Sequence, residues 1–353
     1  MQRPSHNFII ASFLALASLT VIGGSWLTVR DRTRVTAVLA TAPLPEPAVP
    51  PKPTIDKVAY DLKLRRLAHV PETATNTDGL LWPATAAYPE FGAILPFKRI
   101  VAYYGNFYAK GMGVLGEYPE DVMLEKFKKE IAAWEAADPE TPVQPAIDYI
   151  AIVAQGGAGD DGMYRARMPE DQIEKALAVA AKVDGIVILE VQAGLSDVMR
   201  EVKSLEPYLL DPKVHLAIDP EFAMKRRQSR PGAVVGTVSA AEVNEAIQYL
   251  SGLVRDHDLP PKILVVHRYT YPMVTDADDI EPTPEVQVVM DMDGWGGMGN
   301  KISSYEAYIA PFPVQFTGFK LFYKNDVKWQ GSRMLTPKEV LDLTPSPSFI
   351  QYQ

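Results

Sequence analysis

Beyond residue 97 the sequence alternates short apolar runs, rich in β-branched residues, with longer amphipathic stretches. This alternation is typical of βα units, in which parallel strands form one sheet and helices cover it. Eight runs are expected to be strands: 99–104, 149–154, 185–191, 214–218, 263–266, 286–290, 318–323 and 348–352.

The segments between these runs carry helix signals. The expected helices are 120–136, 170–183, 195–209, 239–257, 303–309 and 336–343. Ser239 precedes Glu242 in capping-box register, which favours a helix start at that point. Thr336 followed by Pro337 is a second start signal, because proline suits the first helical position.

Eight strands with helices between them predict an α/β fold, namely a (β/α)8 barrel of the TIM type over residues 98–353. The alternative is an open doubly wound sheet, which commonly carries a glycine-rich phosphate loop directly after its first strand. The segment from Gly111 to Gly116 fits GxGxxG, but it does not directly follow the first strand. We therefore interpret it as a glycine-rich loop.

The N-terminus predicts membrane targeting. No charged side chain occurs from residue 8 to 29, a length comparable to the roughly 20 helical residues that span a bilayer. Residues 1–30 are expected to be a signal peptide or a transmembrane anchor. The protein would then be anchored in the cell envelope by its N-terminal segment and face outward, or be secreted.

A proline-rich segment separates this stretch from the barrel. Six prolines, at positions 43, 45, 47, 50, 51 and 53, favour an extended polyproline II conformation. Residues 31–97 are therefore expected to be a semi-rigid linker followed by an irregular lead-in.

Charge and cysteine content exclude several classes of function. The net charge is −9, which disfavours a nucleic-acid partner because such proteins normally present a basic surface. The chain has no cysteine, so disulfides, thiolate metal sites and cysteine nucleophiles are excluded.

Polar residues follow the apolar runs, at the strand ends where barrel enzymes place their active sites. Four acids are the candidate catalytic residues: Glu190, Asp219, Glu221 and Asp291. The candidate substrate-binding residues are Tyr103, Tyr104, Gln192, His267, Tyr269, Asp293, Trp295, Lys320 and Tyr323. If the barrel forms, these side chains converge on one mouth.

Paired carboxyl groups with nearby aromatic rings suit glycoside hydrolysis of an extracellular or cell-wall carbohydrate, with no cofactor. Glu221 is the expected acid, because it projects past Pro220 towards the mouth. Asp291 or Asp219 would be the nucleophile or base.

Two other functions remain open. Glu190, Asp219, Glu221, His267 and Asp291 would also suit a hydrolase that depends on a divalent cation such as Mg²⁺, Ca²⁺ or Mn²⁺. A noncatalytic barrel that binds a polysaccharide is the third possibility, because a barrel fold does not imply catalysis.

The region from Arg99 to Gln353 resembles a group of uncharacterised bacterial exported proteins with a glycoside-hydrolase-like (β/α)8 barrel. The resemblance rests on five segments: 101–105 (VAYYG), 111–116 (GMGVLG), 219–224 (DPEFAM), 291–294 (DMDG) and 320–323 (KLFY). Asp219 and Glu221 are also similar to the strand-end Asp-x-Glu pair of barrel-type muramidases. The DxxDxDxE motif of chitinase-like barrels is absent.

Overall fold

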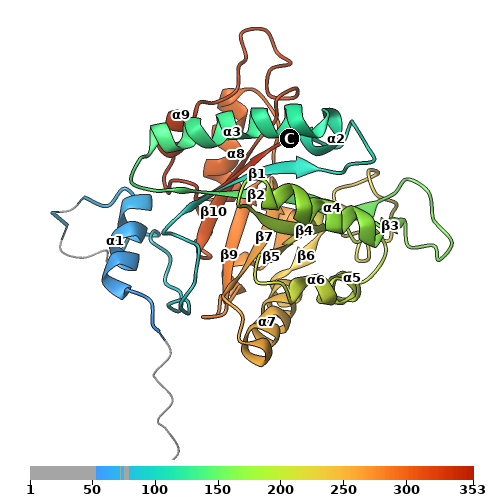
Figure 1. The fold of residues 1–353 in the computed structure, drawn as a ribbon, viewed down its shortest axis with the longest axis horizontal. Coiled ribbons are helices and arrows are strands. Elements are labelled where there is room, and N and C mark those ends of the chain that lie inside the picture. The colour runs from blue at the N-terminus through green and yellow to red at the C-terminus, as the bar shows by residue number, and fades with distance from the viewer. Residues whose placement is uncertain (1–52, 72, 75–78) are drawn as a thin grey trace, which may run out of the picture. The chain divides into compact units, whose positions relative to one another are not determined.

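The computed structural model describes residues 53–71, 73–74 and 79–353. Eight parallel strands follow one another around a ring in the order β1, β11, β10, β9, β7, β5, β4, β2, and β2 pairs again with β1 (Figure 1). They are β1 (Arg99–Gly105), β2 (Val143–Ala154), β4 (Ile186–Val191), β5 (Val214–Ile218), β7 (Lys262–Arg268), β9 (Val286–Met292), β10 (Phe316–Leu321) and β11 (Phe349–Tyr352). The predicted closed (β/α)8-type barrel is therefore confirmed.

Helices cover the outside of this ring. They are α2 (Val114–Glu117), α3 (Glu120–Ala137), α4 (Glu170–Ala181), α5 (Val198–Ser204), α6 (Glu206–Leu209), α7 (Ala240–His257), α8 (Met298–Tyr308) and α9 (Pro337–Leu341). Both predicted starts form complete capping boxes, Ser239 with Glu242 at α7 and Thr336 with Glu339 at α9. The expected helix 195–209 is divided into α5 and α6, with Pro207 in the first turn of α6.

The connection from β7 to β9 departs from the regular pattern. It contains the 3₁₀ turns η2 (Tyr271–Met273) and η3 (Ala277–Asp279) and the short strand β8 (Val274–Thr275), which pairs with β6 (Val238–Ser239). Prolines at 272, 282 and 284 explain this, because proline in a helix interior removes a hydrogen bond and clashes with the preceding turn. The remaining strand, β3 (Arg165–Arg167), runs antiparallel along β2.

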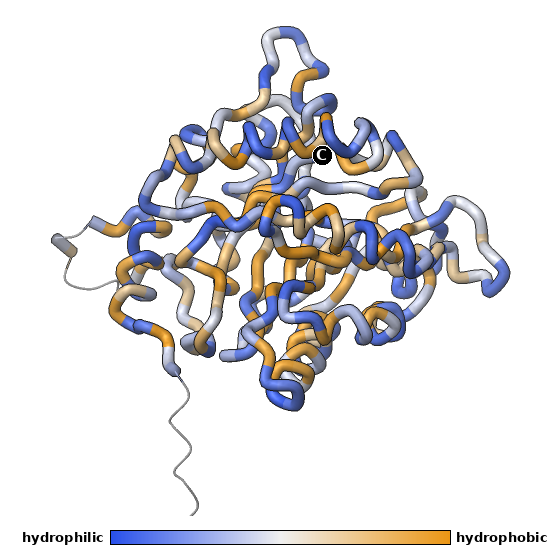
Figure 2. The backbone as a smooth tube through the Cα atoms, in the orientation of Figure 1, coloured by the Kyte–Doolittle hydropathy of each residue, from blue (hydrophilic) through white to orange (hydrophobic). Residues whose placement is uncertain are grey.

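Apolar residues lie along the strands and on the inward sides of the helices, whereas hydrophilic residues mark the loops and outer helix surfaces (Figure 2). A large cluster packs between strands and helices. A second cluster fills the barrel interior near the N-terminal ends of the strands, and its members include Ala102, Ile188, Val265 and Phe349.

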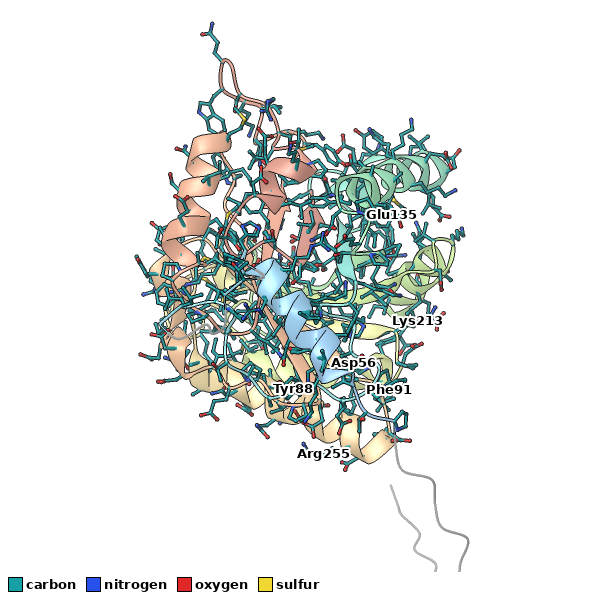
Figure 3. All side chains as sticks on the ribbon, turned by 90° about the vertical axis from the view of Figure 1, so that its left-hand side faces the viewer. Asp56, Tyr88, Phe91, Glu135, Lys213 and Arg255 are labelled. Carbon is teal, nitrogen blue, oxygen red and sulfur yellow. The ribbon has the colours of Figure 1, made fainter. Side chains whose placement is uncertain are left out.

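The expectation of an irregular lead-in is wrong for its middle part, which forms helix α1 (Lys57–Leu67), capped by Asp56. This helix lies across the N-terminal end of the barrel (Figure 3), and its Tyr60 joins the inner cluster together with Leu95. Buried Gln287 on β9 accepts from the backbone N–H of Ile94 and Leu95 and donates to the Leu95 carbonyl. The lead-in therefore closes the base of the barrel.

The expected targeting segment (1–30) and the proline-rich part of the linker (31–52) lie outside the described residues. Among the residues described, none of the helices combines the length and apolar character that crossing a membrane requires.

Candidate functional site

A cavity of about 780 Å³ opens at the C-terminal ends of the barrel strands. It exists there because every second residue of a strand points inward, and the inward residues change from apolar to polar along each strand. On β4, for example, Ile188 belongs to the inner apolar cluster, whereas Glu190 and, just past the strand end, Gln192 belong to a polar network.

The structure brings most of the predicted residues to this mouth. Eight of them line the cavity: Tyr104, Gln192, Asp219, Glu221, Tyr269, Asp293, Trp295 and Lys320. Glu190, His267 and Asp291 are not in the cavity wall; they are completely buried and contact one another directly beneath it. Eight of the predicted residues therefore share one cavity wall, and three more lie beneath it.

Tyr103 and Tyr323 do not lie at the mouth, and this part of the expectation is corrected. Tyr103 stacks on Phe127 of α3, with ring centroids 4.4 Å apart, and its hydroxyl lies 2.9 Å from that of Tyr323. Tyr323 stacks on Tyr352 and donates to Glu130 of α3. Both rings therefore pack between the barrel and its helices, because they alternate with the inward-facing Tyr104 and Phe322.

Asp219 and Glu221 follow β5 and belong to one local structure. Asp219 caps the 3₁₀ turn η1 (Pro220–Phe222) by accepting from the Glu221 backbone N–H at 2.9 Å. Burial and the negative charge of Glu190 raise the pKa of Asp219 well above its usual range. Burial and Asp293 also raise the pKa of Glu221, partly offset by a hydrogen bond with Tyr269. Both carboxyl groups therefore bind a proton more readily than an exposed carboxyl group does.

Asp293 has different surroundings. Its Oδ1 pairs with Lys320 Nζ at 2.9 Å, and its Oδ2 lies 3.6 Å from His267 Nδ1. Lys320 Nζ also lies 3.8 Å from the centre of the Tyr104 ring. Burial lowers the pKa of Lys320, but Asp293 and Glu190 outweigh this and raise it overall, so the lysine stays charged. Asp293 therefore faces two cationic groups.

The floor beneath the cavity is a hydrogen-bonded layer centred on His267. Its Nδ1 lies 3.1 Å from Asp291 Oδ2, and its Nε2 lies 3.1 Å from Glu190 Oε2. Burial disfavours the charged ring, but these carboxylates outweigh it and hold the pKa of His267 well above its usual range. The same contacts keep the pKa of Glu190 below its usual range despite its burial.

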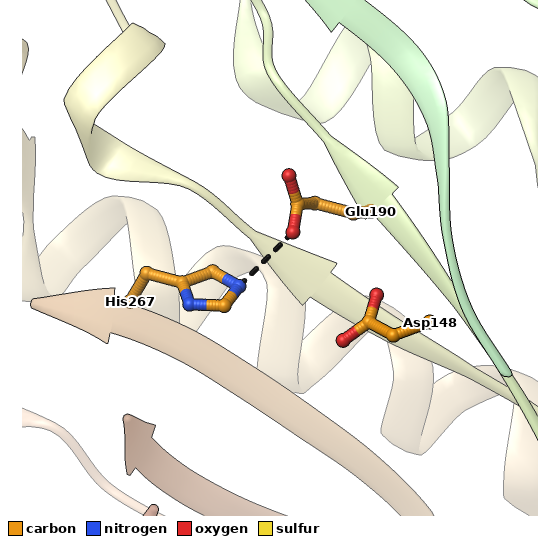
Figure 4. Close-up of side chains that lie close together, drawn as sticks. All are labelled: Asp148, Glu190 and His267. Atoms are coloured by element: carbon orange, nitrogen blue, oxygen red, sulfur yellow. Dashed lines mark ion pairs between the residues drawn. The ribbon is translucent and has the colours of Figure 1, made fainter. Parts of the chain in front are cut away.

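Two members of this floor were not among the predicted residues. Asp148 on β2 and Gln351 on β11 are fully buried, and Gln351 Nε2 donates to Asp148 Oδ2 at 2.6 Å. Asp148 lies close to Glu190 and His267 (Figure 4). Six carboxyl groups therefore share this region with the side chains of His267 and Lys320: Asp148, Glu190, Asp219, Glu221, Asp291 and Asp293.

A pair of tryptophans marks the rim. Trp295 lines the cavity and is 56% exposed; Trp329, in the loop after β10, is 45% exposed. Their rings stack with centroids 5.7 Å apart and an interplanar angle of 20°. Trp329 was not predicted, because it lies in a loop rather than at a strand end.

Comparison with known proteins finds similarity among solved structures, one of which is a mannanase. No protein-family model and no curated protein matches the sequence. The crystal structure of a ruminal GH26 endo-β-1,4-mannanase matches with a TM-score of 0.32 and 9% identity, over 73% of this chain and 59% of the mannanase chain. The chain thus spans less than two thirds of that protein, and the barrel is assigned from its own strand pairing.

Proposed function

We propose that this barrel is a glycoside hydrolase and that its substrate binds in the cavity at the C-terminal end. The observation that carries the proposal is one cavity wall with two carboxyl groups in opposite environments. Burial raises the pKa of Glu221, whereas Asp293 faces Lys320 and His267. Glycosidases need such a pair, one group protonated and the other ionised.

In this proposal Glu221 is the general acid that protonates the leaving glycosidic oxygen. Asp293 takes the role of nucleophile or base, which the sequence pattern alone gave to Asp219 or Asp291. Asp291 lies beneath the cavity wall, and the pKa of Asp219 favours its protonated form. Asp219 then donates a hydrogen bond to the substrate. The ammonium group of Lys320 stabilises the negative charge of Asp293.

The cavity surroundings support a carbohydrate as the substrate. Tyr104, Tyr269 and Trp295 line its wall, and aromatic rings offer the flat apolar faces on which sugar rings stack. The charged side chains of the wall, Asp293 and Lys320, pair with each other, so the wall carries little net charge when Asp219 and Glu221 are protonated. A neutral envelope or extracellular glycan fits these features best.

The decisive test is turnover of envelope glycans by the full-length protein, measured as new reducing ends. Asp293→Asn should lower kcat by at least about 10²-fold, whereas Asp160→Asn, an exposed carboxylate outside the cavity wall, should not change it. Equal activity of both variants would refute the assigned role. Saturable glycan binding without turnover by the wild type would instead identify a noncatalytic polysaccharide-binding barrel.

We also propose that the protein acts in the cell envelope or outside the cell. The support is the uncharged stretch 8–29 and the proline-rich segment that follows it. Cell fractionation with an antibody against the barrel tests this. Recovery of the protein in the cytosolic fraction alone would overturn it.

A further inference from the structure

Five buried polar atoms of the floor make no hydrogen bond: Asp148 Oδ1, Glu190 Oε2, His267 Nε2, Asp291 Oδ1 and Gln351 Oε1. Three of these atoms belong to Asp148, Glu190 and His267, and within this group Glu190 Oε2 and His267 Nε2 form an ion pair at 3.1 Å. The three residues come from β2, β4 and β7, their side chains are completely buried, and they offer one ligand atom each within 4.8 Å of the others (Figure 4). Buried polar atoms without a hydrogen bond are costly, and the contact between Glu190 and His267 leaves Asp148 Oδ1 without a partner, so their convergence requires an explanation.

The second polar atom of each residue is held by a neighbour. Gln351 donates to Asp148 Oδ2, and Tyr104 and Gln192 both donate to Glu190 Oε1. His267 Nδ1 contacts Asp291 Oδ2 at 3.1 Å. Metal-binding histidines and carboxylates are typically held in this way, with the outer atom bonded to the protein and the inner atom directed at the ion.

The spacing is also suitable for an ion. Glu190 Oε2 and His267 Nε2 are 3.1 Å apart. Two ligands that bind an ion at about 2.1 Å and at right angles to each other would be separated by about 3.0 Å. The separation of 3.1 Å therefore fits two neighbouring ligands of one ion as well as it fits a direct ion pair.

We propose that Asp148, Glu190 and His267 form a binding site for one divalent cation, beneath the cavity and separate from the proposed catalytic pair. One imidazole and two carboxylates favour Mn²⁺ or Zn²⁺ over Ca²⁺, which prefers six to eight oxygen ligands. A double positive charge also balances the excess of carboxyl groups better than a proton on His267 does. None of the three ligands belongs to the cavity wall, so the ion holds the floor in place.

The experiment measures metal in the full-length protein purified from medium containing Mn²⁺ and Zn²⁺, by elemental analysis after extensive dialysis. We expect about one equivalent of one metal in the wild type. Asp148→Asn, which keeps the acceptor for Gln351, should lose it. Asp291→Asn should weaken binding by about 10- to 100-fold, because Asp291 only orients His267.

Glu221→Gln is the matched control, because it removes a carboxyl group of the cavity wall and leaves the three ligands intact. It should retain the metal even where hydrolysis is abolished, which separates this inference from the proposed function. Thermal unfolding of the wild type gives a second measurement: the melting temperature should rise with added Mn²⁺ or Zn²⁺ but not with Ca²⁺.

A wild type that contains no metal and whose melting temperature does not respond to either ion would overturn the proposal. Equal metal content in the wild type and in Asp148→Asn would overturn it as well. If Asp148→Asn does not fold, the wild-type metal content and the Asp291→Asn affinity decide the question.

Discussion

The two halves of the barrel interior are built on the same strands but differ in chemistry. Towards the N-terminal ends, the inward residues are apolar except for Gln287, and they pack against the lead-in. At the next inward-facing position along the strand, β4 changes from Ile188 to Glu190 and β7 changes from Val265 to His267. The base is thus a hydrophobic core, and the mouth is a layer of buried charge.

With the function proposed above, this difference would separate stability from activity. Burying apolar side chains stabilises a protein, whereas burying a carboxyl group costs free energy unless it is paired or protonated. The apolar base therefore offsets the cost of the mouth. Substitutions in the base should lower stability, and substitutions in the mouth should lower activity.

The largest expected effect is on catalysis at the mouth. Glu221→Gln should reduce kcat by about 10²–10⁴-fold, because it removes the proton donated to the leaving group. The free energy of unfolding at neutral pH should not fall. Steady-state kinetics and urea denaturation measure the two quantities, with the exposed Glu174→Gln as the control. A fall in the free energy of unfolding that accompanied the fall in kcat would contradict the separation of stability from activity.

The matching substitution in the base is Ile188→Ala. Ile188 is fully buried in the inner cluster, so the truncation should lower the free energy of unfolding by about 2–5 kcal/mol. Turnover per folded molecule should stay the same, because the residue does not reach the cavity wall. Urea denaturation with parallel activity assays checks this. A fall in kcat at full folding would show that the two halves are coupled.

A smaller effect concerns the pH dependence of stability. The pKa of Glu221 is raised above its ordinary value of 4.5 in the folded state, so the folded state binds more protons there than the unfolded state. The stability that this bound proton contributes is fully present below pH 4.5 and is lost as the pH rises through the raised pKa of the folded state. The wild type should therefore lose stability relative to Glu221→Gln as the pH increases, and a difference constant with pH would contradict the shift.

The smallest expected effect is at the rim. Trp295→Ala should raise KM by about tenfold or less with kcat unchanged, since it removes one aromatic contact remote from the reacting bond. Phe91→Ala, an equally exposed aromatic beside the N-terminal end of the barrel, is the control (Figure 3). A change in kcat rather than KM would place Trp295 closer to the chemistry than the structure indicates.

Much of the fold could be predicted because the barrel strands are apolar and the helices carry cap signals. The site was predicted where a polar residue directly follows such a run, as with Asp219 after β5. Strand alternation could also have excluded Tyr103, because it lies on the opposite face from Tyr104 on the same strand.

Other parts lacked a local signal. Asp148 was missed because β2 begins at Val143 and contains Pro145, so the expected run began only at Tyr149 and excluded the acid. Gln351 lies within an apolar strand, where an amide gains meaning only through its contact with Asp148. By contrast, the helix α1 was missed although its sequence carries helix signals. Asp56 is a suitable N-cap, and Tyr60, Leu64 and Leu67 recur at helical spacing on the side that packs against the barrel.

The closed base also has a kinetic consequence. Because Tyr60 and Leu95 fill the N-terminal end of the interior, molecules enter and leave the cavity on the mouth side. A departing product and an incoming substrate must then use the same passage in turn. For the proposed hydrolase, accumulated product should therefore compete with fresh substrate for entry.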